Sequence, residues 1–183
     1  MAPPGAGRTA EPERPVACAR AAIPGWDSGS PARPAAPACA IGGGVCKLYL
    51  LDTNVISELR RPRPHTAVVA WISAVSPDEL FLSAVALGGL QAGVEITWRQ
   101  DASKAEAIER WVDALTTTHN ILSADGVIFR RWAQLMHRKS ADLIEDALIA
   151  ATALVHNMTV VTRNVRDFEW LGVPVINPFR RAS

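Results

Sequence analysis

The sequence predicts an α/β fold with a central parallel sheet, in one domain that spans residues 47–180. Short apolar runs without alternation, such as Leu48 to Leu51, are typical of strands that are covered on both faces. These runs alternate along the chain with amphipathic segments of helical period, and such alternation indicates strand–helix–strand units. A chain of 183 residues is also long enough for one domain with a sizeable core and an appended segment.

Residues 1–46 differ in composition from everything that follows. Eight of the thirteen prolines fall there, among Ala, Gly and Arg. Such a segment cannot bury enough apolar surface to offset the entropy of ordering it, so we predict a disordered tail. A second hypothesis is that the tail is not translated and that synthesis starts near Val45 at a non-AUG codon. The intact mass of the natively expressed protein distinguishes the two.

Charge, cysteine content and hydropathy set the expected compartment. The formal net charge of +1 gives no global electrostatic argument for nucleic acid, membrane or acidic partners. Cys18, Cys39 and Cys46 all precede the first strand, a distribution that fits a reducing compartment better than a disulfide scaffold. The longest apolar run of the predicted domain, Ala147 to Val155, is too short to span a bilayer. We therefore expect a cytoplasmic protein without a membrane partner.

Each expected element has a local reason. The first strand stops at Asp52, and the next two residues suit the start of a helix that reaches about Leu59. The later elements follow in chain order: a helix from Pro64, a strand at 80–82, a helix from Ala84 to about Trp98 capped by Ser83, a helix capped by Asp101, a strand at 120–122, a helix capped by Asp125, a buried helix opening at 142–145, a strand at 158–162 and an edge strand at 173–176.

Two acidic residues, Asp52 and Asp146, are candidates for a functional site. Asp52 follows a buried strand, at the edge where open α/β sheets bind their ligands, although taken alone a helix-cap role is the simpler interpretation. Asp146 lies on a helix that is apolar nearly all round, and burying an ionised carboxylate there is costly unless a cation or donors satisfy it. Asp142 and Glu145 have the spacing of a capping box, which would give both a structural role.

The segment from Arg163 to Asp167 repeats the pattern seen at Asp52, with polar and acidic residues after a β-branched strand. Oxygen-bearing groups at strand ends and on a buried helix suggest Mg²⁺ or Mn²⁺, and with it metal-assisted hydrolysis of a phosphate ester. No Ser-His-Asp or Cys-His arrangement competes. The basic cluster Arg60, Arg61 and Arg63 is either solvated surface or a phosphate contact.

Residues 47–180 resemble a PIN-domain ribonuclease of the VapC type, the toxin of a bacterial type II toxin–antitoxin pair. Four motifs carry the resemblance in order: Leu51-Asp52-Thr53-Asn54-Val55-Ile56-Ser57-Glu58, Glu145-Asp146-Ala147-Leu148-Ile149-Ala150-Ala151-Thr152-Ala153, Thr162-Arg163-Asn164 with Asp167-Phe168, and Val173-Pro174-Val175-Ile176-Asn177-Pro178-Phe179. The resemblance implies a three-layer α/β/α sandwich, Mg²⁺-dependent cleavage of RNA, a homodimer and a VapB-type antitoxin in the active-site groove.

The same resemblance implies roles for six residues. It makes Asp52 and Asp146 the metal ligands, with Mn²⁺ as a possible substitute for Mg²⁺. Asn164 and Asp167 supply or support the fourth acidic position of the catalytic group. Thr53 and Asn54 orient Asp52 or contact substrate.

The chain departs from the family pattern at Gly89. Family members usually carry a glutamate here, in a segment ending Gly-Glu-Leu, whereas this chain reads Leu87-Gly88-Gly89-Leu90. We expect Glu95 to lie on too late a turn to replace it, and Glu145 to point elsewhere on its helix. Because small misplacements of a metal or water cost about 10²-fold in rate, the sequence predicts a weakened nuclease. The alternative function is a catalytically impaired PIN module that dimerises and binds antitoxin without efficient RNA cleavage.

Overall fold

The computed structural model describes residues 47–137 and 140–180. The predicted tail at 1–46, with its three cysteines, lies outside these residues. The described part contains one sheet of five parallel strands in the order β3-β2-β1-β4-β5. The strands are β1 (Tyr49–Leu51), β2 (Leu80–Ser83), β3 (Asn120–Leu122), β4 (Thr159–Val161) and β5 (Val175–Ile176). The predicted α/β class with a central parallel sheet is confirmed.

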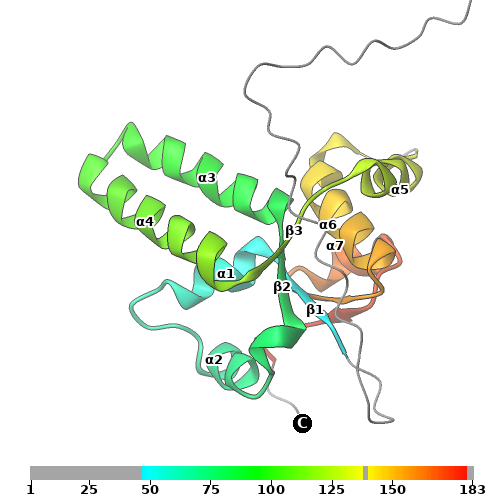
Figure 1. The fold of residues 1–183 in the computed structure, drawn as a ribbon, viewed down its shortest axis with the longest axis horizontal. Coiled ribbons are helices and arrows are strands. Elements are labelled where there is room, and N and C mark those ends of the chain that lie inside the picture. Colours follow the sequence, from blue (N-terminus) through cyan, green and yellow to red (C-terminus); the bar gives the residue numbers. More distant parts are fainter. Residues whose placement is uncertain (1–46, 138–139, 181–183) are drawn as a thin grey trace, which may run out of the picture. The chain divides into compact units, whose positions relative to one another are not determined.

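Helices cover both faces of this sheet. They are α1 (Thr53–Leu59), α2 (Thr66–Ser73), α3 (Ala84–Trp98), α4 (Ala102–Thr118), α5 (Gly126–Met136), α6 (Ile144–Val155) and α7 (Val165–Trp170), with 3₁₀ turns η1 (Pro77–Glu79) and η2 (Ala141–Leu143). Figure 1 shows α3 and α4 on one side of the strands and α5, α6 and α7 on the other. The three-layer arrangement is therefore confirmed. The sequence does not predict α7, because six residues are too few to display a helical period.

Three of the predicted helix caps are present in the structure. Ser83 Oγ accepts from the Ala86 N–H at 3.0 Å, and Asp101 Oδ1 accepts from the Lys104 N–H at 3.0 Å. Asp125 caps α5 in the same way. Each cap satisfies backbone donors that a helix start leaves without partners, and contributes about 1 kcal/mol. These caps fix where α3 and α5 begin after their strands and where α4 begins after α3.

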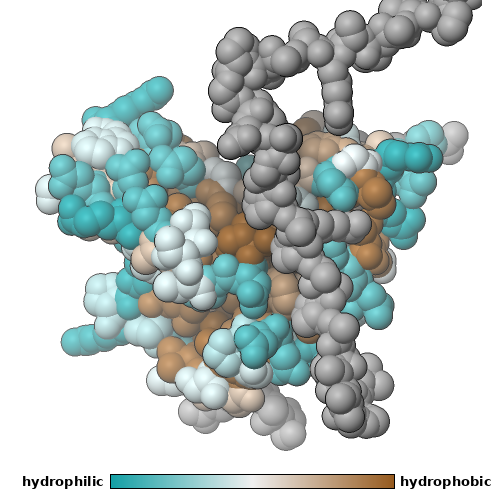
Figure 2. Space-filling view, in the orientation of Figure 1, coloured by the Kyte–Doolittle hydropathy of each residue, from teal (hydrophilic) through white to brown (hydrophobic). Residues whose placement is uncertain are grey.

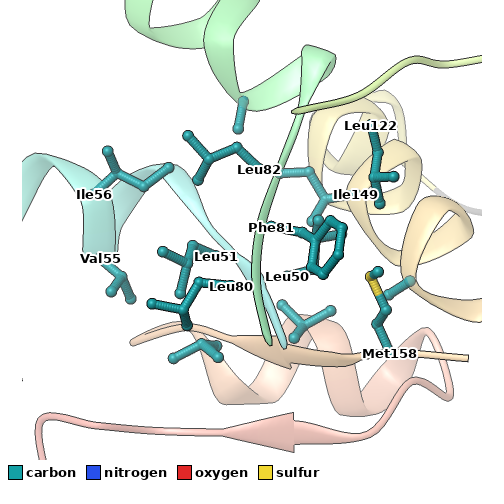
Figure 3. Close-up of a cluster of buried hydrophobic side chains, with 14 of the residues drawn as sticks. Leu50, Leu51, Val55, Ile56, Leu80, Phe81, Leu82, Leu122, Ile149 and Met158 are labelled. Carbon is teal, nitrogen blue, oxygen red and sulfur yellow. The ribbon is translucent and has the colours of Figure 1, made fainter. Parts of the chain in front are cut away.

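The core lies on both faces of β1 and β2. The register pairs Leu50 with Phe81, and both side chains point towards Ile149 of α6 (Figure 3). The next side chain along β1, Leu51, points to the opposite face, where Val55 of α1 packs. Since strands in this position are buried on both faces, their apolar run lacks alternation, as the sequence indicated.

The connections reverse direction at β1. The chain adds β2 and then β3 on one side of β1, and later crosses the sheet to place β4 on the other side. In open α/β sheets such a reversal leaves a crevice at the carboxyl ends of the two strands, where ligands bind. The register pairs Leu51 with Val161, so Asp52 and Thr162 lie side by side in this crevice.

Some large apolar side chains remain on the surface. Val127 and Phe129 of α5 are about half exposed, and Ile144 at the start of α6 is also exposed. Figure 2 shows brown, hydrophobic residues among teal ones on the side of the molecule that α5 occupies. Within residues 47–137 and 140–180, no helix combines the length and the apolar character needed to cross a bilayer.

Candidate active site

The site is built around Asp52, which follows β1. Its backbone N–H donates to the Val161 carbonyl at 3.0 Å, so sheet pairing continues one residue beyond the strand. Its Oδ1 accepts from the Thr53 N–H at 2.6 Å, which is the helix-cap role that the sequence also allowed. Asp52 is only 4% exposed, so the sheet and α1 together fix the position of its carboxylate.

Thr162 holds the second oxygen of Asp52. The buried Thr162 hydroxyl donates to Asp52 Oδ2 at 2.7 Å, and accepts from Asn54 Nδ2 at 3.1 Å and from the Asn164 N–H at 2.9 Å. Asn54 Nδ2 also donates to Asp52 Oδ2, and Asn54 Oδ1 accepts from the Arg163 N–H at 3.1 Å. Asn54 thus ties the start of α1 to the segment after β4 and orients Asp52.

Thr162 belongs to one of the four motifs that carry the family resemblance, but the sequence alone predicts no role for it in the site. The signal that finds it is the register of the sheet. Thr162 follows β4 as Asp52 follows β1, and parallel neighbours bring equivalent positions together. Without knowing that β4 is next to β1, this equivalence is not visible in the sequence.

Asp146 reaches the same place from the first turn of α6 and is partly buried. Asn164 Nδ2 donates to Asp146 Oδ2 at 3.2 Å and to Asp167 Oδ2 at 2.7 Å. One amide therefore links two acids that lie on different helices. Asp167 itself lines a neighbouring hollow with Arg166, so it supports Asn164 from behind.

These side chains converge on an open pocket of about 270 Å³. It is lined by Asp52, Thr53, Asn54, Ser57, Glu145, Asp146, Ile149 and Asn164. Of the six predicted site residues, all except Asp167 line this pocket. None of the lining residues is basic. A larger hollow of about 770 Å³ lies between α2 and the segment after β5, but no acid lines it and it is remote from this chemistry.

Glu145 was expected to point away from the pocket, and that expectation is wrong. Glu145 lines the pocket, and its charge raises the pKa of both Asp52 and Asp146. The predicted capping box is also wrong, because α6 begins without a side-chain cap and Asp142 instead accepts from the Ser140 hydroxyl at 2.9 Å. Glu145 therefore has no role in capping the start of α6.

Gly89 on α3 faces the same pocket. A Cβ added there would lie 3.6 Å from Glu145 Oε2 and 3.9 Å from Thr53 Oγ1. These are ordinary contact distances, so a methyl group fits. A longer side chain at position 89 would meet the Glu145 carboxylate. Position 89 is thus adjacent to the site, as the resemblance implied, and it contributes no carboxylate.

The acids of the pocket are difficult to ionise together. Burial raises the pKa of Asp52, although hydrogen bonds from Thr162, Thr53 and Asn54 oppose the change. Burial, followed by the charges of Asp52, Asp167 and Glu145, raises the pKa of Asp146 to about 6. A cation is the partner that would stabilise these carboxylates in their charged form.

The donor set fits a hard divalent cation that keeps part of its water shell. Mg²⁺ is usually held by one or two carboxylates together with waters, and Asp52 and Asp146 provide two. Among the described residues, no three His, Cys, Asp or Glu side chains are close enough together to enclose a metal ion by themselves. The pocket therefore suits an ion shared between protein, water and a substrate phosphate.

The basic cluster after α1 lies at the opposite end of that helix from the pocket. Arg61 Nη1 is 3.0 Å from Glu58 Oε2, and the Arg60 guanidinium lies 5.7 Å from the centroid of the Trp111 ring. Two of the three arginines thus make structural contacts on the outside of α1. Of the two interpretations, the surface role fits this arrangement better than a phosphate contact in the pocket.

Comparison with known proteins agrees with the geometry. The family model of the PIN domain matches residues 49–171, which include both strands that flank the crevice and every residue that lines the acidic pocket. The chain therefore belongs to the PIN-domain family.

Curated relatives define the branch of that family. The plasmid stability protein StbB of Pseudomonas syringae is 36% identical, over 72% of this chain and 99% of its own length. The VapC ribonuclease Y4jK of Sinorhizobium fredii is 35% identical, over 74% and 100%. Toxin FitB of Neisseria gonorrhoeae is 34% identical, over 72% and 99%. The predicted resemblance to VapC-type PIN domains is confirmed.

Solved structures show the same fold. The crystal structure of FitAcB from Neisseria gonorrhoeae matches with a TM-score of 0.65 and 33% identity, over 72% of this chain and 99% of that chain. A toxin–antitoxin complex from Klebsiella pneumoniae matches with a TM-score of 0.50 and 26% identity, over 71% and 97%.

Proposed function

We propose that the chain is a metal-dependent endoribonuclease and the toxic component of a type II toxin–antitoxin system, with its PIN domain at residues 47–180. The convergence of Asp52 and Asp146 on one pocket at the topological switch point is the observation that carries the proposal. Relatives named as a VapC ribonuclease and as a toxin support the choice of RNA and of the biological role.

The proposed division of roles follows the contacts. Asp52 and Asp146 bind Mg²⁺, for which Mn²⁺ can substitute. Thr162 and Asn54 hold Asp52, and Asn164, backed by Asp167, holds Asp146. When bound, the cation would lower the pKa of an attacking water and stabilise the charge that develops at phosphorus.

Thr53 has a further proposed role. Its backbone N–H fixes Asp52, while its hydroxyl faces the pocket close to Gly89. That placement supports contact with a substrate phosphate, the second of the two roles expected for this residue.

A cleavage assay tests the proposal. Purified full-length protein, freed of any antitoxin, is expected to cleave RNA with Mg²⁺ or Mn²⁺ and to stop when EDTA is added. Asp146→Asn should abolish the cleavage, whereas Asp142→Asn, which removes an acid outside the pocket, should not. Cleavage that persists in EDTA or in Asp146→Asn contradicts the proposal.

The proposed partners are a VapB-type antitoxin and a second copy of the chain. The structural match to a toxin–antitoxin complex supports the first. The exposed apolar side chains of Val127, Phe129 and Ile144 support a further protein contact, because the buried core of an interface is formed by apolar and aromatic side chains. Sedimentation of the purified chain, with and without its antitoxin, measures both associations.

Gly89 favours a second candidate function, a PIN module that binds antitoxin but cleaves RNA poorly. This candidate predicts that Gly89→Glu increases cleavage substantially by supplying a missing carboxylate. A wild-type rate that matches the variant would show that the missing acid is irrelevant.

A further inference from the structure

We propose that Glu145 is the third carboxylate of the pocket, and that Gly89 leaves it the space to be there. The inference rests on the proposed function, since it names a further residue of the same metal-dependent site. In this chain, an acid on α6 takes the place of the glutamate that is missing from α3.

The position of Glu145 on α6 fits this role. α3 and α6 contact each other, and Gly89 and Glu145 lie on the two surfaces that meet. Glu145 lines the same pocket as Asp52 and Asp146. Its charge is felt by both, which places the three carboxylates within electrostatic reach of one another.

The space next to Gly89 is taken by the Glu145 side chain. The Glu145 carboxylate lies 3.6 Å from the point where a Cβ of residue 89 would be. A glutamate at position 89 would extend three atoms beyond that Cβ, into the region that the Glu145 side chain occupies. The two positions are therefore alternatives, and this chain has the acid on α6.

The Glu145 carboxylate is also available to bind an ion. Glu145 caps no helix and makes no ion pair or hydrogen bond with another residue of 47–137 or 140–180. Asp52, Asp146 and Glu145 do not enclose an ion as they stand, so Glu145 must rotate to complete the site. Its side chain is exposed, and this rotation breaks no contact with the described residues. Glu145 lies in the first turn of α6, where a carboxylate also interacts favourably with the helix dipole.

Metal binding is the direct test. The probe is Mn²⁺ alone, titrated calorimetrically into the full chain freed of antitoxin. Glu145→Gln should weaken binding about tenfold, as expected when one of several groups that hold a metal is lost. The matched control is Glu95→Gln, which removes the same charge from an exposed glutamate on α3 whose partner is Gln91, and it should bind as the wild type does.

Two further variants show whether location or charge alone matters. Glu145→Asp keeps the charge but shortens the side chain, and it should bind Mn²⁺ with an affinity between those of the wild type and Glu145→Gln. The double variant Gly89→Glu with Glu145→Ala should recover the wild-type affinity, because alanine at position 145 vacates the space and the glutamate on α3 returns a carboxylate to it. Thermal melts followed by circular dichroism establish that each variant is folded.

The outcomes separate this inference from the proposed function. If wild type binds Mn²⁺, Asp146→Asn does not, and Glu145→Gln matches Glu95→Gln, then the role of Glu145 is overturned while the metal site stands. If wild type binds no Mn²⁺, the proposed function fails and the inference fails with it.

The single variant Gly89→Glu gives an independent check. An impaired enzyme would gain activity from the added acid. If Glu145 already supplies the third carboxylate, a glutamate at position 89 would repel it. RNA cleavage should then fall or stay level. A large gain in cleavage would overturn the inference.

Discussion

Asp52 and Asp146 face one pocket but are held in different ways. Asp52 is almost completely buried, and it accepts hydrogen bonds from a backbone N–H and two side chains that belong to α1 and to the segment after β4. Asp146 is partly exposed and has the Asn164 amide as its hydrogen-bond donor among the described residues. The strand-end half of the site is therefore preorganised by the sheet, whereas the α6 half can adjust when a cation arrives.

Removal of the carboxylate from either half should have the largest effect. Asp52→Asn and Asp146→Asn each remove a charge that the proposed cation needs, and RNA cleavage should fall on the order of 10³-fold, which corresponds to several kcal/mol of lost transition-state stabilisation. Cleavage rates with saturating Mg²⁺ measure this loss. If one of the two variants retained nearly full activity, then that carboxylate would not be needed to hold the cation.

Loss of the Thr162 hydroxyl tests the rigid half alone. Thr162→Val keeps the shape of the buried side chain but removes the bonds to Asp52, Asn54 and Asn164. We expect a loss of about 1–3 kcal/mol in the free energy of unfolding and a fall in cleavage of about 10- to 100-fold.

The control for that variant is Thr152→Val. Thr152 is equally buried, but its hydroxyl donates only to the Leu148 carbonyl within α6. Urea denaturation and RNA cleavage measured on both variants should show a large change in activity for Thr162 only. Equal activities would mean that the orientation of Asp52 does not matter.

The adjustable half should show itself in the pH dependence of stability. In metal-free protein the pKa of Asp146 is raised from 3.8 to about 6, so folding favours its protonated form. Its contribution to stability is full below pH 3.8 and is lost as the pH rises through 6. Asp146→Asn should therefore be more stable than wild type at pH 7, on the order of 1–2 kcal/mol after allowance for solvent screening.

Urea denaturation in EDTA measures this difference. It should shrink towards zero at pH 4, where wild-type Asp146 is protonated. A difference that is independent of pH would show that the gain comes from packing and not from the removed charge.

Glycine replacements on α3 should have the smallest effect. Gly88→Ala and Gly89→Ala each place a methyl group in a helix interior where it meets no obstacle closer than 3.6 Å. Each should raise the free energy of unfolding by about 0.5–1 kcal/mol. The added methyl at 89 touches the adjustable half, yet cleavage should remain at the wild-type level. Loss of activity in Gly89→Ala alone would show that the space beside Glu145 is more restricted than these distances indicate.

The part of the site that the sequence predicted is the part that local chemistry determines. Asp52 follows a strand that is recognisable from its apolar run, and Asp146 is conspicuous on an apolar helix. The roles of Thr162 and Glu145 depend on which strand lies next to β1 and on how α3 packs against α6. Neither relation can be inferred from a short stretch of sequence. The role of Thr162 was therefore missed, and the direction of Glu145 was predicted wrongly.

The fold was likewise predicted where local sequence determines it and missed where tertiary contacts do. Parallel strands, helix caps and the edge position of β5 follow from composition within a few residues, and they were predicted. The short α7 and the missing cap of α6 depend on tertiary contacts that override local preference. Position 89 was predicted only in part. The sequence shows that a carboxylate is absent there, but it does not show which neighbouring side chain fills the space.

The pairing of β1 with β4 also has a consequence for synthesis of the protein. Asp52 and Thr162 are 110 positions apart in the chain. Contacts between such distant segments form late, because a long loop must close first. A growing chain that has emerged as far as α6 already carries Asp52, Glu145 and Asp146, but it lacks β4 and the hydroxyl that orients Asp52. The pocket is assembled only after β4 and Thr162 have been synthesised, so chains that have not yet reached β4 are expected to be harmless to the RNA being translated.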